Sequence, residues 1–312
     1  MSQEKILLCD MGGTHARFAK FVGHGEYTDF KKYRLHDFSS FEDIVQKYID
    51  DTNSSFENAR FAVARTPQNG VISYKRFAGD PDYKIDFNTI RTQFKWDNLI
   101  TLNDLEAGAH GARILDTEQS QILIPSKTEN INNHRILISV GTGVGHAGIM
   151  NDQILRTAGG HFFPVTVTDE HRKVEKFIRG KKDKSIALIM EDFVSARGLR
   201  MITEYVSGQK NDDLSNAEFM DHLKNHPDAS RLFFEFLGLH AQNIVSVTGF
   251  YGGVYLTGGV IDTLIHHKLD SWDAFAIYFC PAMVPVVRDR LNSTPINYVL
   301  HDELPLLGLT AL

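Results

Sequence analysis

Short apolar runs that end in glycine-rich turns occur once in each half of this chain. Residues 6–9 are continuously apolar, which is typical of a strand buried on both faces. Two glycines at 12–13 interrupt that run before strand-forming residues resume at 17–22. A second apolar run at 135–140 leads into the glycine-rich residues 141–145 and then into another apolar stretch. The pattern predicts a duplicated unit of strand, glycine turn and strand.

The remaining segments alternate between helical and strand patterns. Residues 41–49 carry apolar side chains at helical spacing, and Ser39 followed by Glu42 has the spacing of a capping box. The two longest helical patterns cover 185–206 and 230–250. Shorter helices are expected at 86–96 and 105–115, and further strands at 59–64, 98–101, 252–259 and 296–302. Alternation of this kind predicts an α/β architecture.

Length and composition narrow the class of protein. A chain of 312 residues has room for two domains, and the polar, turn-rich segment 112–134 is the expected boundary, giving domains 1–112 and 113–300. A net charge of −6 without a dense Lys/Arg run argues against nucleic-acid binding. No signal peptide or membrane span is expected, so we predict a cytoplasmic protein without a membrane partner. The two cysteines, Cys9 and Cys280, form neither a disulfide framework nor a zinc cluster.

The two glycine turns are candidates for binding phosphate. Backbone N–H groups can converge on phosphate oxygens only where the chain comes very close, which glycine permits. DMGGT at 10–14 and GTGVG at 141–145 meet this requirement, and Thr14 and Thr142 could each add a donor. Either turn alone could be a plain hairpin, but two matched turns favour a nucleotide site. The chain has no GxxxxGK[ST] motif, which excludes the P-loop kinases.

A dinucleotide-binding alternative depends on the string GVGHAG at 143–148. This string fits GxGxxG, but that fingerprint requires a helix to open at the same point. Here residues 149–152 form a short apolar run followed by a turn, so the match is expected to be accidental. A nicotinamide-dependent oxidoreductase stays open as a third reading, which failure to bind NAD(H) would close.

Six segments resemble motifs of the bacterial glucokinase family, which belongs to the hexokinase–actin–chaperone ATPase superfamily. They occur in the family's order over nearly the whole chain: DMGGTHARFA (10–19), LNDLEAGAHGA (102–112), SVGTGVGHAGIM (139–150), AGGH (158–161), GFYGGVYLTGGVI (249–261) and HDELPLLG (301–308). The resemblance implies a two-lobed, actin-like, ribonuclease H-like α/β fold, each lobe a mixed sheet flanked by helices. It also implies that residues 301–312 join the N-terminal lobe.

The same resemblance implies an ATP-dependent hexose kinase that acts on a sugar hydroxyl, with the 6-hydroxyl of glucose favoured. Asp104 would be the general base, and Asp10 would lie near Mg²⁺. The residues implied to hold ATP are Gly12, Gly13, Thr14, Gly141, Thr142, Gly143, Gly145, Gly258 and Gly259, together with Asp10. The residues implied to bind the sugar are Asn103, Asp104, His161 and Glu191. A homodimer is implied by the family alone.

Several positions depart from the family pattern. Ala158 stands where a glutamate usually precedes Gly-Gly-His, and residues 70–83 contain no match to the family's Thr-Asn pair. Arg65 and His15 also differ from the usual residues, and the terminal helix is expected to be short or missing. These departures concern sugar binding and the contacts of the two lobes, and they leave both glycine turns that are candidates for binding phosphate unchanged. They keep open a second reading, a nucleotide- or sugar-binding regulatory protein, or a kinase for a different sugar. The phosphate donor, ATP or polyphosphate, also stays open.

Overall fold

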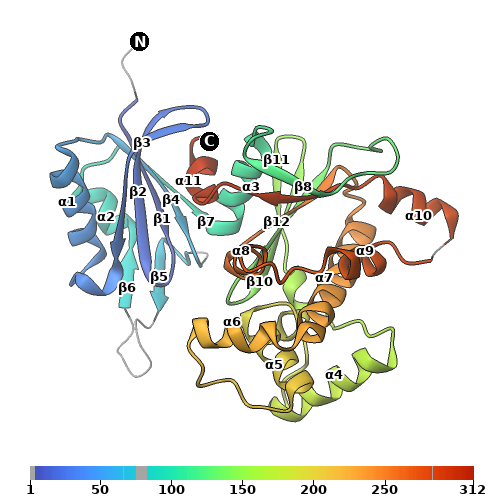
Figure 1. Ribbon diagram of the computed structural model, residues 1–312. Helices are drawn as coiled ribbons and strands as arrows, with labels where there is room; N and C mark the ends of the chain where they lie inside the picture. The colour runs from blue at the N-terminus through green and yellow to red at the C-terminus, as the bar shows by residue number, and fades with distance from the viewer. Residues whose placement is uncertain (1–3, 66, 75–82, 283) are drawn as a thin grey trace. The chain divides into compact units, whose positions relative to one another are not determined.

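The computed structural model describes residues 4–65, 67–74, 83–282 and 284–312 (Figure 1). The contacts within the chain divide it into two compact units. Unit 1 comprises Met1–Asp116 with His301–Leu312, and unit 2 comprises Thr117–Leu300. The C-terminal twelve residues therefore pack with the N-terminal part of the chain.

Unit 1 is built on a five-stranded mixed sheet. In spatial order its strands are β3 (Glu26–Arg34), β2 (His15–Gly23), β1 (Ile6–Met11), β4 (Asn58–Val63) and β7 (Asn98–Asn103). The first three are antiparallel neighbours, whereas β1, β4 and β7 run parallel. A small antiparallel pair, β5 (Val71–Tyr74) with β6 (Tyr83–Asp86), lies beside this sheet in the same unit.

The two faces of this sheet are covered by different helices (Figure 1). Successive side chains of a strand point to opposite faces, so the apolar run of β1 serves two cores. Leu7 and Cys9 pack in a cluster with α1 (Phe41–Thr52) and α2 (Phe87–Gln93). Ile6 and Leu8 pack in a second cluster with α3 (Asp104–Ile114) and α11 (Leu304–Leu309). Burial on both faces explains why the run is continuously apolar.

Helices α3 and α11 approach each other so closely that glycine is required at the contact. A Cβ atom on Gly308 would overlap the carbonyl oxygen of Ala107, and one on Gly111 would meet the carbonyl oxygen of Leu304. The helix at the end of the chain is short, as the sequence predicts. It nevertheless anchors the C-terminal segment to the helix that begins at Asp104.

Unit 2 repeats the strand arrangement of unit 1. Its six-stranded sheet has the order β11 (Gln153–Arg156), β10 (Val144–Met150), β9 (Arg135–Val140), β12 (Gly253–Thr257), β13 (Ile296–Val299) and β8 (Ser120–Ile124). Strands β11, β10 and β9 are antiparallel, and β9, β12 and β13 run parallel. The predicted duplication and the fold class, two mixed sheets flanked by helices, are therefore confirmed.

Seven α-helices accompany this second sheet in the described part of the chain. They are α4 (Asp169–Lys181), α5 (Ala196–Ser207), α6 (Asn216–Lys224), α7 (Pro227–Thr248), α8 (Gly259–His266), α9 (Trp272–Phe279) and α10 (Pro285–Asn292). The predicted helix at 230–250 corresponds to α7, which is buried over most of its 22 residues. Its apolar side chains form one large core with those of β9 and β12.

Two sequence predictions differ from the structure. The predicted helix at 185–206 begins only at Ala196, because residues 190–192 form a separate 3₁₀ turn. The capping box of α1 uses Ser40 and Asp43, one residue beyond the predicted pair. The prediction that GVGHAG is an accidental match is confirmed, because Gly143 lies in the turn before β10 and residues 144–148 lie in that strand, where no helix begins. Within the described residues, we find no helix with the length and apolarity needed to cross a bilayer.

Candidate functional site

The predicted residues of unit 1 lie at one edge of its sheet. Parallel strands β1, β4 and β7 are in register there, with Met11 opposite Val63 and Val63 opposite Asn103. The first glycine turn follows β1, and Asp104 follows β7 directly. Because parallel strands end at the same edge, the sheet brings the turn and Asp104 together although about ninety residues separate them.

Asp10 is a buried carboxylate next to this turn. Its position in β1 is directly opposite Arg17 in β2, and the Arg17 guanidinium donates to its Oδ2 atom at 3.1 Å. The same guanidinium forms an ion pair with Glu303 at 2.8 Å. Burial raises the pKa of Asp10 to about 7, and Arg17 opposes this rise while the carboxylates of Asp104 and Glu303 add to it. Two carboxylates, those of Asp10 and Glu303, thus share one guanidinium.

Asp104 is the first residue of α3, and its neighbour Asn103 caps the helix. The Asn103 side chain accepts a hydrogen bond from the N–H of Leu105 at 3.1 Å. Asn103 is therefore the N-cap, and Asp104 is the first residue inside the helix. Burial raises the pKa of Asp104, and hydrogen bonds from backbone N–H groups and Asn103 oppose that rise. A carboxylate with a raised pKa is a better proton acceptor than an exposed one.

The first glycine turn is short and open. The N–H of Gly12 donates to the carbonyl of His15 at 3.0 Å, which closes the hairpin between β1 and β2. Gly13 and Thr14 are exposed at its tip, and a Cβ atom on Gly13 would have no neighbour within 4 Å. Glycine is therefore not required there by the surrounding protein. A phosphate group that contacts the backbone N–H groups would explain why a residue without a side chain is present at this position.

The second glycine turn, in unit 2, contacts Glu191. Its hairpin is closed by a hydrogen bond from the N–H of Gly141 to the carbonyl of Gly143 at 2.8 Å. The Glu191 carboxylate accepts from the N–H of Val144 at 3.3 Å. A Cβ atom on Gly143 would overlap that carboxylate, so glycine at 143 makes room for Glu191.

The Gly-Gly-His turn at 159–161 packs against the same place. A Cβ atom on Gly160 would overlap the carbonyl oxygen of Val144, so these two backbones are in direct contact. The carbonyl of Phe162 accepts from the N–H of Met190 at 2.8 Å, which ties the end of the turn to the residue before Glu191. His161 and Ala158 are exposed. Three predicted segments of unit 2 therefore gather around Gly143–Val144.

A pocket of about 390 Å³ adjoins the second glycine turn within unit 2. Gly141 and Thr142 line one side, and Gly259 at the start of α8 lines another. The remaining wall comes from α5 and α6 and includes Leu199, Arg200, Asn216, Phe219 and Met220. The pocket combines apolar walls with polar side chains beside a glycine turn, which suits a flat heteroaromatic base.

Gly258 is required by both its conformation and its neighbours. Its φ of 105° lies in the region that side chains rarely adopt, and a Cβ atom would meet the carbonyl oxygen of Val140 at 2.5 Å. The bend at Gly258 turns the chain from β12 into α8, where Gly259 reaches the pocket.

Four residues that the sequence did not single out contribute to these surroundings. Arg17 pairs with both Asp10 and Glu303, and the Arg200 guanidinium stacks over Phe219 with 4.3 Å between its central carbon and the ring centroid. Arg17 lies in the DMGGTHARFA segment and Glu303 in the HDELPLLG segment. Both segments were therefore identified from the sequence, but neither residue was assigned a role. Residues 75–82, where the Thr-Asn pair was sought, lie outside the described residues.

Magnesium would fit the edge of unit 1. Within the ranges that the structure describes, no three His, Cys, Asp or Glu side chains are grouped to hold a metal ion. Mg²⁺ does not need such a group, because it commonly binds one or two carboxylates together with substrate phosphates and water. Asp10, Asp104 and Glu303 are carboxylates of this edge, and Arg17 pairs with the first and the last of them. Asp10 is the carboxylate closest along the chain to the glycine turn.

Comparisons with known proteins agree on one family. The profile described as Glucokinase matches residues 7–312. Glucokinase of Helicobacter pylori (strain P12) is 27% identical over 335 residues, covering 96% of this chain and 97% of that protein. A bifunctional protein glk of Paraburkholderia xenovorans is 27% identical over 273 residues, but the match covers 83% of this chain and only 41% of that protein.

The fold agrees as well. The crystal structure of a glucokinase from an Antarctic psychrotroph has a TM-score of 0.82 at 23% identity, and the alignment covers 99% of this chain and 98% of that one.

Proposed function

Because the chain belongs to the glucokinase family of sugar kinases, we propose that it transfers the γ-phosphoryl group of ATP to a hexose hydroxyl. The favoured acceptor is the 6-hydroxyl of glucose, which gives glucose 6-phosphate. The observation that carries the proposal is the pair of glycine hairpins, each at the same place in its sheet. A homodimer stays a prediction.

Asp104 is the proposed general base. Its carboxyl group follows β7 at the edge where the first glycine turn lies, and burial raises its pKa. In phosphoryl transfer the protein mainly positions the reactants and stabilises charge, so one carboxylate that accepts the hydroxyl proton suffices. The hydrogen bond from the Leu105 N–H to Asp104 Oδ1, at 2.8 Å, fixes the orientation of that carboxylate.

The backbone and the pocket of unit 2 are proposed to bind ATP. Gly141, Thr142 and Gly143 would contact the inner phosphates, with Gly145 behind them in β10. Gly258 and Gly259 would leave room for the adenosine, which would occupy the pocket walled by α5 and α6. Gly13 and Thr14 would donate to the transferred phosphoryl group, and Gly12, whose N–H closes the hairpin, would let the chain come close to it. Mg²⁺, held by Asp10 and the phosphates, would neutralise charge on the phosphate oxygens.

The sugar is proposed to be held by Asn103, Asp104, His161 and Glu191. Glu191 and His161 come from segments that touch each other through the Phe162–Met190 hydrogen bond. The Asn103 side chain caps α3 through its oxygen, and its NH₂ group donates to Asp104. The second N–H of that group would donate to a sugar hydroxyl. Carboxylate and amide groups of this kind recognise hydroxyls by hydrogen bonds.

The test is release of ADP with a panel of hexoses and amino sugars, with ATP or polyphosphate as donor, repeated with Asp104→Asn. Loss of the general base is expected to lower kcat by about a hundredfold or more while the variant still binds ATP. Asn keeps the size and hydrogen-bonding oxygen of Asp, so the fold should be retained. An Asp104→Asn enzyme with unchanged kcat would exclude the assigned role.

A binding protein with little turnover is the alternative that Ala158 favours. This residue lacks the carboxylate that usually precedes Gly-Gly-His, and it is exposed at the start of that turn. Calorimetric binding of ATP, with no sugar of the panel turned over, would support this alternative.

A further inference from the structure

Asp192 is a buried carboxylate with three partners from three segments. Its side chain is only 1% exposed. It pairs with Lys182 at 2.5 Å and with Arg197 at 2.7 Å, and it accepts from the N–H of Ile189 at 2.9 Å. A carboxylate at this depth is strongly destabilised unless its charge is paired and its oxygens are hydrogen-bonded. Both requirements are met here.

This carboxylate determines the shape of the turn that carries Glu191. Residues 190–192 form the 3₁₀ turn, and the hydrogen bond from Ile189 to Asp192 closes it. Glu191, between them, points its carboxylate at the second glycine turn and accepts from Val144. The turn also has backbone hydrogen bonds of its own, from the N–H of Asp192 to the carbonyl of Ile189 at 2.9 Å and from Phe193 and Val194 to the carbonyl of Met190. The Asp192 side chain adds the contacts that tie this turn to α4 and α5.

Both cations that hold Asp192 come from helices. Lys182 is the C-cap residue of α4, and Arg197 stands in the first turn of α5. The Arg197 side chain is 60% exposed whereas that of Lys182 is 19% exposed. Because exposed ion pairs are weak, the pair with Lys182 is the stronger of the two.

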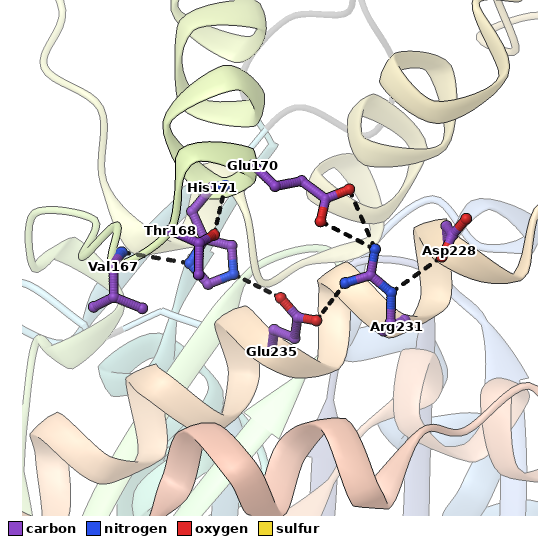
Figure 2. Close-up of polar contacts among 7 residues, drawn as sticks. All are labelled: Val167, Thr168, Glu170, His171, Asp228, Arg231 and Glu235. Atoms are coloured by element: carbon purple, nitrogen blue, oxygen red, sulfur yellow. Dashed lines mark hydrogen bonds and ion pairs between the residues drawn. The ribbon is translucent and has the colours of Figure 1, made fainter. Parts of the chain in front are cut away.

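The opposite end of α4 is fixed to α7 by a network of polar side chains (Figure 2). His171, which is fully buried, contacts Glu235 through Nε2 at 2.7 Å. Arg231 of α7 pairs with Glu170 of α4 at 3.2 Å and also with Glu235. Lys182 therefore extends from a helix whose first turn is already held in place.

We propose that Asp192 is a positioning residue for the sugar, which acts by holding the 190–192 turn so that Glu191 faces Gly143 and Val144. This inference rests on the proposed function, because it takes Glu191 as a sugar ligand. The cations from α4 and α5 fix the turn from two sides, and Glu191 then needs no reorientation when sugar binds.

The variant Asp192→Asn tests this role. Asparagine keeps an oxygen that can accept from Ile189 but loses the charge that holds Lys182 and Arg197. The KM for sugar is expected to rise by about tenfold, as for loss of a charge-assisted hydrogen bond, while the KM for ATP is unchanged. The effect should disappear in a Glu191→Gln background, because Asp192 acts only through Glu191. Lys182→Met should raise the KM for sugar in the same way. If Asp192→Asn does not fold, the Lys182→Met variant tests the positioning role in its place.

Glu204→Gln is the matched control. Glu204 is also a largely buried carboxylate of unit 2, and it pairs with Lys181, so it joins α4 to α5 without touching the turn. Its replacement should lower thermal stability and leave the KM for sugar unchanged. Equal increases in sugar KM for Asp192→Asn and Glu204→Gln would overturn the proposal in favour of a general loss of stability.

Hydrogen exchange at the Val144 amide gives a measurement that does not depend on kinase activity. This N–H donates to Glu191, so Asp192→Asn should accelerate its exchange and Glu204→Gln should not. Unchanged exchange in Asp192→Asn would refute the positioning role. If the wild-type protein turns over no sugar, while Asp192→Asn still accelerates exchange at Val144 and Glu204→Gln does not, the proposed function is refuted. The positioning of Glu191 by Asp192 would then still hold.

Discussion

Ala158 is the residue whose replacement we expect to change sugar binding most. It precedes the Gly-Gly-His turn and is exposed there, so a longer side chain has room. The sequence alone identified this departure, because the neighbouring glycines and His161 match the family motif. What the sequence did not reveal is that Glu191, from a separate turn, lies against the same part of the chain.

The variant Ala158→Glu is expected to tighten binding of glucose. A carboxylate that accepts from sugar hydroxyls contributes about 1.5–3 kcal/mol per charge-assisted hydrogen bond, which corresponds to at least about a tenfold lower Kd. Calorimetry with glucose measures the effect. Ala158→Gln is the control, since it has the same length without the charge. If the Glu and Gln variants bind glucose no better than the wild type, position 158 does not contact the sugar.

At the scale of elements, the contact between α3 and α11 links the C-terminal segment to the helix that begins at Asp104. The sequence predicted a helix at 105–115, and it predicted that the terminal helix is short or missing. It did not predict which glycines make the contact, and the structure shows that Gly308 and Gly111 bring the backbones of α11 and α3 together. The long helix expected over 185–206 was wrong in its first half, because the Asp192 ion pairs favour a 3₁₀ turn there.

The variant Gly308→Ala should destabilise unit 1. The added methyl group overlaps the carbonyl oxygen of Ala107, so α3 and α11 must separate, at a cost of about 1–3 kcal/mol or more in the free energy of unfolding. Urea unfolding followed by the fluorescence of Trp96 measures it. Gly180→Ala, in α4, is the control, because its Cβ atom has no neighbour within 4 Å. It should stabilise its helix by up to about 1 kcal/mol. A Gly308→Ala protein as stable as the wild type would show that the helix contact is looser than described.

At the scale of the whole molecule, the two units are expected to respond differently to pH. Burial raises the pKa of Asp10 in unit 1 from 3.8 to about 7, so the folded unit binds this proton more readily than the unfolded chain. Its contribution to stability is therefore largest at low pH and is lost as the pH rises through about 7. Burial lowers the pKa of His240 in unit 2 from 6.5 to about 4. Its contribution is present above pH 6.5 and is lost as the pH falls towards 4.

Lowering the pH from 7.5 to 5.5, without magnesium, should therefore lower the melting temperature of unit 2 relative to that of unit 1. Trp96 and Trp272 are the two tryptophans of the chain and lie in different units, so Trp96→Phe and Trp272→Phe variants report each unit separately. Asp10→Asn should remove most of the pH response of unit 1. If the melting temperatures of both units change by the same amount between pH 7.5 and 5.5, the assigned pKa changes are contradicted.

The sequence by itself determined the two hairpins, the α/β alternation and the family, because glycine turns, buried strands and capping residues act through neighbours along the chain. Only the tertiary structure decided which charges meet. Arg17 bridges Asp10 and Glu303, nearly three hundred residues apart in the sequence, and Asp192 holds Lys182 and Arg197 around the Glu191 turn. Ion pairs of this kind carry no periodic signal, since they depend on burial and on the distance between elements.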